Sequence, residues 1–320
     1  MSNVPKKHHF LPEFYLRGFC RDSSLWTYDL EKDQYDPRRP EIFGIKKHFY
    51  SITDSEGKRD PHVEKQLAKV EGRVAPVFRR LDEAPDRSLS RQETKDLALF
   101  AAFMKFRVLE FHNWLEGFAE TIFKERAKTE VQTVEAVRQQ LESMEGITSS
   151  DLEHAEEIFR RVQEGEYGIE LNPDYRVTEM VEQANQFAEV LFQSNWALIK
   201  APENSSFAVS DNPLVNFYPR SVRHLVEEQT QGFNLDRMED PYSLSSQGIT
   251  SRHMVKCLPL SQHLCLLMGS NKGLFKKTHT ADRQQVREIN ENIARFAVRF
   301  LVARDESLLR RLTRSIPDRA

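Results

Sequence analysis

The 320-residue chain has few cysteines, few glycines and no long apolar run. Its three cysteines, Cys20, Cys257 and Cys265, include no Cys-x-x-Cys pair, which argues against a disulfide scaffold or a zinc ribbon. No stretch approaches the ~20 consecutive apolar residues that a membrane-spanning helix needs. Twelve glycines are few, which favours long helices over a turn-rich β architecture. These absences predict a reduced, cytoplasmic protein that does not contact a membrane.

The sequence motifs of several enzyme classes are also absent. The chain contains no Gly-x-Gly-x-x-Gly sequence and no P-loop, so nucleotide binding by those devices is not expected. It lacks the Gly-x-Ser-x-Gly nucleophile elbow, and it has neither the His-Glu-x-x-His nor the His-x-His spacing of a zinc site. Any chemistry must therefore depend on residues that come together from distant segments.

Charge is unevenly distributed along the chain, although the net charge is only −3. Between Glu130 and Glu189 there are 15 acidic and 4 basic residues, a balance of −11, so the rest of the chain carries +8 by subtraction. Two interpretations stay open. A basic body could bind a polyanion such as nucleic acid or a nucleotide phosphate, or the charges could form a solvated helix face and a charged tail. The arginines near the C-terminus are Arg295, Arg299, Arg304, Arg310, Arg311, Arg314 and Arg319.

Apolar periodicity predicts a mainly α-helical α+β protein, with central buried helices and a small antiparallel β-sheet. We expect one domain over residues 1–320. It would contain an N-terminal arm with short strands (1–60), a helical body (61–195), a small β region (196–280), and a C-terminal helix and tail (281–320).

Individual elements follow from the period of the pattern and from capping and turn residues. Residues 33–40 are expected to form a loop, and the strands at 196–201 and 206–210 are expected to form a hairpin. Helices are expected over residues 61–81, 90–127, 131–145, 151–165, 177–195 and 281–303. The other expected strands are 25–30, 48–52, 255–260 and 263–269.

Arg107 is the main anomaly of the helical body. In a continuous helix over residues 90–127, it would emerge from a face with aromatic residues four and seven positions away on both sides. An unpaired buried guanidinium is costly, so Arg107 needs a carboxylate, a bound anion or a route to water. We expect Glu64 or Glu71 to be that carboxylate.

Three carboxylates could frame a site. Glu64 and Glu71 are two helical turns apart at the border of the apolar stripe, about 10 Å along the helix axis. Asp211 follows an expected strand in the sequence Ser210-Asp211-Asn212-Pro213. Each also has a structural interpretation, because Asp before Asn-Pro commonly forms an Asx-turn and glutamates commonly lie at a helix surface.

The histidines near the N-terminus contribute at most one member of a site. His8 and His9 are adjacent, so on an extended backbone their side chains point to opposite sides. His48 begins another expected strand and could meet His9 in space. A metal site here would use Glu64, Glu71, Asp211 and His48 as ligands, and the metal would be magnesium or manganese.

The segment from His8 to Phe19 resembles the start of the Domain of Unknown Function 4238 family. The resemblance continues at Leu25–Asp29, His48–Ser51 and the helix with the two glutamates, and it covers about residues 5–305. It implies a bacterial protein of similar length, and no established activity. The polar positions that resemble the family are also those that are physically anomalous, namely His9, Tyr15, His48, Glu64, Glu71, Arg107 and Asp211.

Two functional hypotheses follow. The first is a metal-dependent hydrolase, most plausibly a phosphodiesterase or nuclease that acts on nucleic acid or a nucleotide. Its catalytic residues would be His9, Glu71, Arg107 and Asp211. The second is a non-catalytic binding or regulatory protein, in which the same groups form a structural salt-bridge network that docks the arm. The sequence leaves the substrate and the oligomeric state open.

Overall fold

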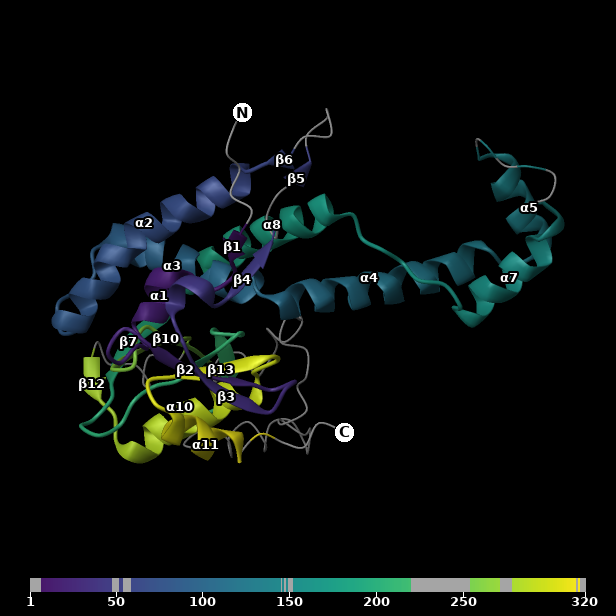
Figure 1. Cartoon of the computed structure of the whole chain (residues 1–320). Coiled ribbons are helices and arrows are strands. Elements are labelled where there is room, and N and C mark those ends of the chain that lie inside the picture. Colours follow the sequence, from purple (N-terminus) through teal and green to yellow (C-terminus); the bar gives the residue numbers. More distant parts are fainter. Residues whose placement is uncertain are drawn as a thin grey trace, which may run out of the picture. The chain divides into compact units, whose positions relative to one another are not determined.

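The computed structural model describes residues 7–47, 52–53, 59–144, 146, 148, 152–219, 254–270, 278–314 and 316 (Figure 1). The chain divides into two compact units. The main unit comprises residues 1–111 and 177–320, and the helical unit comprises residues 112–176. The single-domain expectation stays a prediction, because this division does not show whether either unit folds alone.

The fold is α+β and mainly helical, which confirms the predicted class. Strands of the main unit form a five-stranded sheet in the order β12-β7-β11-β10-β9. Neighbouring strands are antiparallel except for β12 and β7, which run parallel, so this sheet is mixed. The strands are β7 (Asn195–Lys200), β9 (Val215–Phe217), β10 (Val255–Pro259), β11 (Leu264–Gly269) and β12 (Thr278–Thr280).

A four-stranded sheet joins the N-terminal arm to the C-terminal part of the chain. Its order is β3-β2-β13-β8, and β13 lies antiparallel to both β2 and β8. The sequence predictions were wrong twice here, because residues 33–40 contain β3 and residues 300–303 are a strand. The second error has a physical reason, since a short continuous apolar run has no period that separates strand from helix. The strands are β2 (Leu25–Asp29), β3 (Gln34–Arg38), β8 (Val209–Ser210) and β13 (Phe300–Ala303).

The hairpin predicted over 196–201 and 206–210 does not form. Strand β7 pairs with β11 and β12, whereas β8 pairs with β13 in the other sheet. Residues between them are held by partners outside the strands, because Phe207 N–H donates to the Gln262 carbonyl and Ala208 N–H donates to the Asn290 side chain. By contrast, the strands predicted at 255–260 and 263–269 are confirmed as β10 and β11, which pair with each other in antiparallel fashion.

Two short strand pairs and two short helices complete the described arm. Strand β1 (Lys7–His9) pairs with β4 (Ile45–Lys47), and β5 (Ile52–Thr53) pairs with β6 (Arg59–Asp60). Residues Glu13–Arg17 form α1, and Pro40–Ile42 form the 3₁₀ helix η1. His9 therefore lies on an extended backbone.

The long helix predicted over 90–127 is broken in two. Helix α3 (Arg91–Phe106) begins with the predicted capping box at Ser90 and Glu93 and is capped at its C-terminus by Arg107, and α4 (Leu109–Glu130) begins two residues later. The predicted helix at 61–81 is confirmed as α2 (His62–Glu83). The remaining helices of the described chain are α5 (Val134–Glu142), α7 (Ala155–Glu164), α8 (Pro173–Gln193), α10 (Arg283–Arg295) and α11 (Glu306–Thr313).

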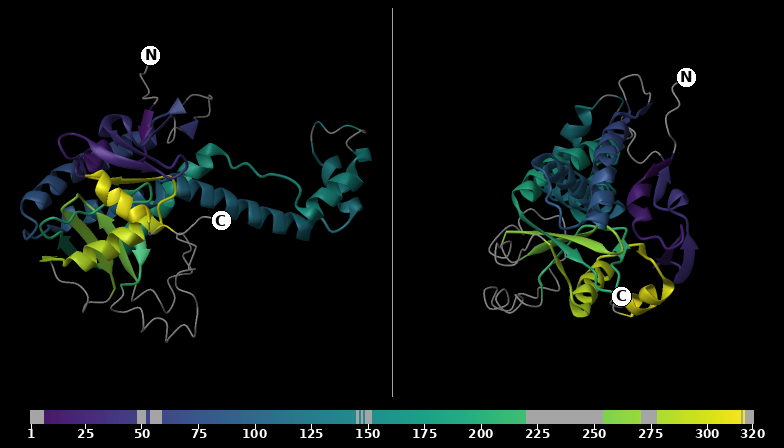
Figure 2. Two further views of the ribbon diagram at one scale, coloured as in Figure 1. Left: turned by 60° about the horizontal axis from the view of Figure 1, so that its bottom comes forward. Right: turned by 90° about the vertical axis from the view of Figure 1, so that its left-hand side faces the viewer.

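A buried apolar cluster connects both sheets of the main unit with α10 and α11. It includes Cys257 and Cys265 from the five-stranded sheet, Leu301 from the four-stranded sheet, and Ile293 and Leu309 from the two helices. In the left view of Figure 2, α10 and α11 lie beside the strands, in yellow-green and yellow. Burial of these apolar groups is the main stabilising contribution to this part of the fold.

A second, aromatic cluster fixes α1 on α2 and α3. The Tyr15 ring of α1 lies 6.1 Å from both Phe78 of α2 and Phe100 of α3, and these two rings are 5.3 Å apart. The rings meet mainly edge to face, which is a favoured aromatic geometry. Aromatic packing thus holds the arm to α2 and α3.

The helical unit has a small core of its own. Val131, Val137 and Ala155 are buried together at the end of α4 and on α5 and α7. Helix α7 ends at Gly165, whose φ of +70° is a left-handed conformation that glycine adopts without strain. Helices with the length and apolar character required to cross a bilayer are absent from the part of the chain that the structure describes.

Candidate functional site

Arg107 lies at the break between α3 and α4, and its side chain is 3% exposed. Its Nη1 is 2.7 Å from Oε1 of Glu71 on α2, and its Nη2 donates to the backbone carbonyl of His9 on β1. The prediction that Arg107 pairs with one of the two glutamates is therefore confirmed, and the partner is Glu71. We call His9, Glu71 and Arg107 the lock cluster.

Glu64 lies two turns before Glu71 on the same helix. Its burial, together with the negative charge of Glu71, raises the pKa of the Glu64 carboxyl above its usual value. The Glu71 side chain is 25% exposed. The structure thus brings Glu71, His9 and Arg107 together, while Glu64 lies two turns away on α2.

His9 contributes its backbone to the lock cluster. The carbonyl oxygen accepts from Arg107, while the imidazole Nε2 is buried and has no hydrogen-bond partner among the described residues. His48, the other histidine of the predicted site, lies outside the residues that the structure describes.

Asp211 follows β8 and is 3% exposed. Its two carboxylate oxygens accept from the backbone N–H groups of Val298 and Arg299, each at 2.9 Å. Burial raises the pKa of Asp211 to about 6; these hydrogen bonds lower the pKa, and the negative charge of Glu110 raises it further. Asp211 therefore fixes the turn that leads into β13, which favours its structural interpretation.

The adjacent residues form a closed polar turn. Ser210 Oγ accepts from the Asn212 N–H at 3.2 Å and donates to the Asn212 carbonyl at 2.9 Å. The Asn212 side chain donates to the Glu110 carboxylate in α4. This local turn is the type of interaction by which Ser, Asp and Asn end strands.

The predicted metal site has no complete ligand set in the described chain. No three His, Cys, Asp or Glu side chains of residues that the structure describes are grouped as metal ligands. Glu71 is paired with Arg107, and both oxygens of Asp211 accept backbone hydrogen bonds. Because His48 lies outside the described residues, magnesium or manganese binding stays a prediction.

Two buried polar residues have roles that the sequence did not reveal. The Tyr15 hydroxyl donates to the Pro259 carbonyl at 2.7 Å, and its pKa is well above the usual value because the group is fully buried. Asn290 accepts from Ala208 N–H and donates to the Ser206 carbonyl, both at 2.9 Å. A signal for Asn290 exists in the sequence, because it occupies the apolar face of α10, four residues after Val286.

Comparison with known families agrees with the resemblance seen in the sequence. Residues 7–307 match the model of the family described as "Protein of unknown function (DUF4238)". The chain belongs to this family. The DUF4238 match includes every candidate site residue from His9 to Asp211. A search of curated proteins and a search of solved structures returned no significant match.

Proposed function

We propose that this DUF4238 protein is a non-catalytic binding protein, in which the lock cluster holds the N-terminal arm on the helical body. The observation that carries the proposal is the environment of Arg107. Its side chain is 3% exposed, and the guanidinium donates to the Glu71 carboxylate and to the His9 carbonyl. A guanidinium engaged in this way is not presented to a substrate phosphate.

Asp211 supports the same interpretation. Each of its two oxygens accepts a backbone hydrogen bond, so the carboxylate already has a structural role in the turn before β13. Arg107 and Asp211, two of the four residues that were expected to act on a substrate, thus have structural partners.

Thermal unfolding with and without divalent metals tests this proposal. We expect Glu71→Gln to lower the melting temperature by the same amount in EDTA, Mg²⁺ and Mn²⁺, because the lost contact is internal. A ligand that binds only the folded state raises its stability, so a metal site would show itself as a metal-dependent increase. An increase that occurs in the natural protein and disappears in Glu71→Gln would contradict the proposal.

A metal-dependent hydrolase, as a phosphodiesterase or nuclease, is the second candidate. It is favoured by the raised pKa of Glu64 and by the buried His9 Nε2 without a hydrogen-bond partner in the described chain, since acid–base groups commonly have perturbed surroundings. Hydrolysis of bis(p-nitrophenyl) phosphate with Mg²⁺ or Mn²⁺ tests it. This candidate requires turnover that His9→Gln and Glu64→Gln abolish while the melting temperature is retained.

We further propose that the protein is located in the cytoplasm. The support is that Cys20, Cys257 and Cys265 are all free, as is usual in reducing compartments. Alkylation of protein from freshly lysed cells under denaturing conditions, followed by mass spectrometry, should label all three thiols, including Cys257 and Cys265, which are buried in the folded chain. Recovery of a Cys257–Cys265 disulfide under these conditions would contradict this location.

A further inference from the structure

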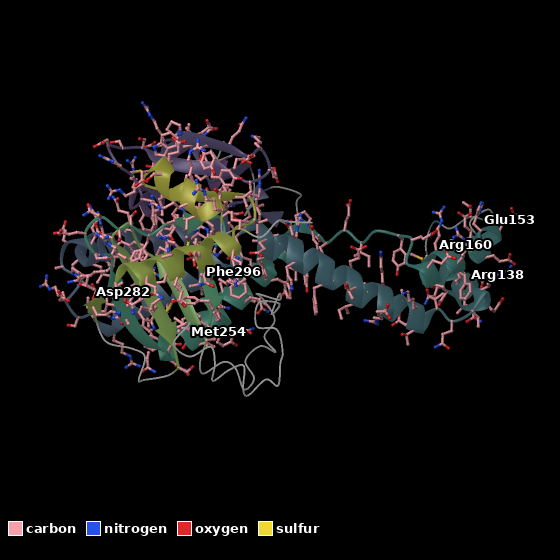
Figure 3. All side chains as sticks on the ribbon, turned by 90° about the horizontal axis from the view of Figure 1, so that it is seen from below. Arg138, Glu153, Arg160, Met254, Asp282 and Phe296 are labelled. Carbon is pink, nitrogen blue, oxygen red and sulfur yellow. The ribbon has the colours of Figure 1, made fainter. Side chains whose placement is uncertain are left out.

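A cavity of about 1070 Å³ lies along α10 and α11, next to the turn at 204–206. Its volume is slightly above the range of about 300–1,000 Å³ that is typical of small-molecule sites. Figure 3 marks the two ends of α10 with Asp282 and Phe296. Five arginines line the cavity, namely Arg283, Arg287, Arg304, Arg311 and Arg314.

Helical spacing explains how the arginines converge. Arg283 and Arg287 are four residues apart on α10, so they lie on one face of that helix. Arg311 and Arg314 are three residues apart at the end of α11. Arg304 immediately precedes the Asp305 cap of α11.

The carboxylates of the lining neutralise only part of this charge. Glu291 lies 4.0 Å from Arg287, and Asp305 lies 3.5 Å from Arg304. Five arginines and two carboxylates leave a net lining charge of +3. Within the described chain, no carboxylate forms an ion pair with Arg283, Arg311 or Arg314.

Asp305 has a structural role as the N-cap of α11. Its Oδ1 accepts from the Leu308 N–H at 2.9 Å and from the Ser307 hydroxyl at 2.7 Å, which caps α11. Arg304 Nε is buried and lacks a hydrogen-bond partner in the described part of the chain, although Asp305 is near. The Arg304 side chain as a whole is 30% exposed, so part of its surface remains open to a ligand.

The chemistry of the lining selects the class of anion. Guanidinium groups bind phosphate oxygens in pairs of parallel hydrogen bonds, and several arginines together favour several negative charges. The apolar lining residues Val286, Leu308 and Leu312 are buried, whereas Asn204, Ser205 and Gln284 add neutral hydrogen-bonding groups. The lining therefore suits a highly charged ligand better than an apolar one.

We propose that this arginine cavity binds a small anion with two or more phosphate groups. A nucleoside triphosphate and an inorganic polyphosphate share this chemistry. The site is built from residues other than the lock cluster, so the proposal goes beyond the binding protein proposed above and does not depend on how the arm is held.

Titration calorimetry of the full chain at low salt, with sodium tripolyphosphate and separately with ATP, tests the proposal. We expect saturable binding with one site per chain. Arg311→Gln should weaken it about tenfold or more, because charge-assisted hydrogen bonds are lost. Arg310→Gln is the matched control, since Arg310 pairs with Glu306 and lies over the Tyr35 ring. Tighter binding of ATP than of tripolyphosphate would identify a nucleotide ligand, and similar binding would identify phosphate recognition alone.

Three results would overturn the proposal. The first is that neither anion binds. The second is that Arg310→Gln and Arg311→Gln weaken binding equally. The third is that a 12-nucleotide single-stranded nucleic acid binds and tripolyphosphate does not displace it. A second measurement avoids dependence on variants. Tripolyphosphate should slow phenylglyoxal modification of Arg311 but not of Arg310 in the natural protein, and equal rates at both arginines would also count against the site.

Discussion

The Arg107 guanidinium lies 2.7 Å from the Glu71 carboxylate, and the two residues are 36 positions apart in the chain. This ion pair joins α2 to the break between α3 and α4, and the His9 carbonyl adds the first strand of the arm. Burying the charge of Arg107 is compensated only while both partners are present. The pair therefore makes the position of the arm dependent on the two helices.

Replacement of Arg107 by methionine should lower the free energy of unfolding by about 2–4 kcal/mol, because Glu71 and the His9 carbonyl lose their donor. Urea denaturation measures this change. Arg17→Met is the control, since Arg17 is 50% exposed and its two partners, Glu13 and Glu41, are 40% and 42% exposed. An exposed pair contributes about 0–1 kcal/mol. If the two substitutions lowered the free energy of unfolding equally, the lock cluster would contribute no more to stability than an exposed ion pair.

Tyr15→Phe should destabilise the protein by about 1–3 kcal/mol, because the buried Pro259 carbonyl loses its donor. Tyr28→Phe provides the comparison, since the Tyr28 hydroxyl bonds to the exposed Asp33 carboxylate, which water can solvate instead. Calorimetric melting of both variants checks the difference. A smaller effect at Tyr15 than at Tyr28 would argue against the observed contact.

Two glycines should respond oppositely to alanine. A Cβ on Gly18 would lie 3.0 Å from the Leu260 carbonyl oxygen and 3.2 Å from Ser261, so Gly18→Ala should cost about 1–3 kcal/mol. A Cβ on Gly72, inside α2, would meet nothing within 4 Å. Gly72→Ala should therefore stabilise the protein by about 0.5–1 kcal/mol through helix propensity. Denaturant midpoints of the two variants should shift in opposite directions.

Asp211 should make stability depend on pH between about 4 and 6. Its pKa is 3.8 in the unfolded reference and about 6 in the folded protein, chiefly because of burial. Between these pH values the folded state binds more protons than the unfolded state. The contribution of Asp211 to the free energy of unfolding therefore falls as pH rises. By pH 7 this stabilising contribution of Asp211 is lost completely, which corresponds to roughly 3 kcal/mol.

Asp211→Asn provides the measurement, because asparagine does not titrate. The difference in unfolding free energy between the natural protein and this variant should change between pH 4.5 and pH 7, in the direction that favours the natural protein at low pH. If the unfolding free energies of the two proteins changed in parallel with pH, Asp211 would not be the source of the pH dependence. Lost acceptor contacts to Arg299 lower the stability of the variant at every pH and cancel in this comparison.

Part of the candidate site could be predicted from single residues. A buried arginine must find an acceptor, so Arg107 was expected to meet Glu64 or Glu71, and it meets Glu71. The use of the His9 carbonyl could not be predicted, because every residue has such an acceptor and no side chain marks it. The amide of Asn290, which bridges Ser206 and Ala208, depends likewise on backbone brought together over more than 80 residues.

The sequence by itself determined the mainly helical α+β class, most helices, the existence of strands β10 and β11, and the requirement for a partner at Arg107. Local periodicity and capping carry this information, because they depend on residues a few positions apart. Only the tertiary structure decided that the helix breaks at Arg107, that β13 is a strand, and that β7 and β8 belong to different sheets. These outcomes depend on long-range strand pairing and burial, which leave no local pattern in the sequence.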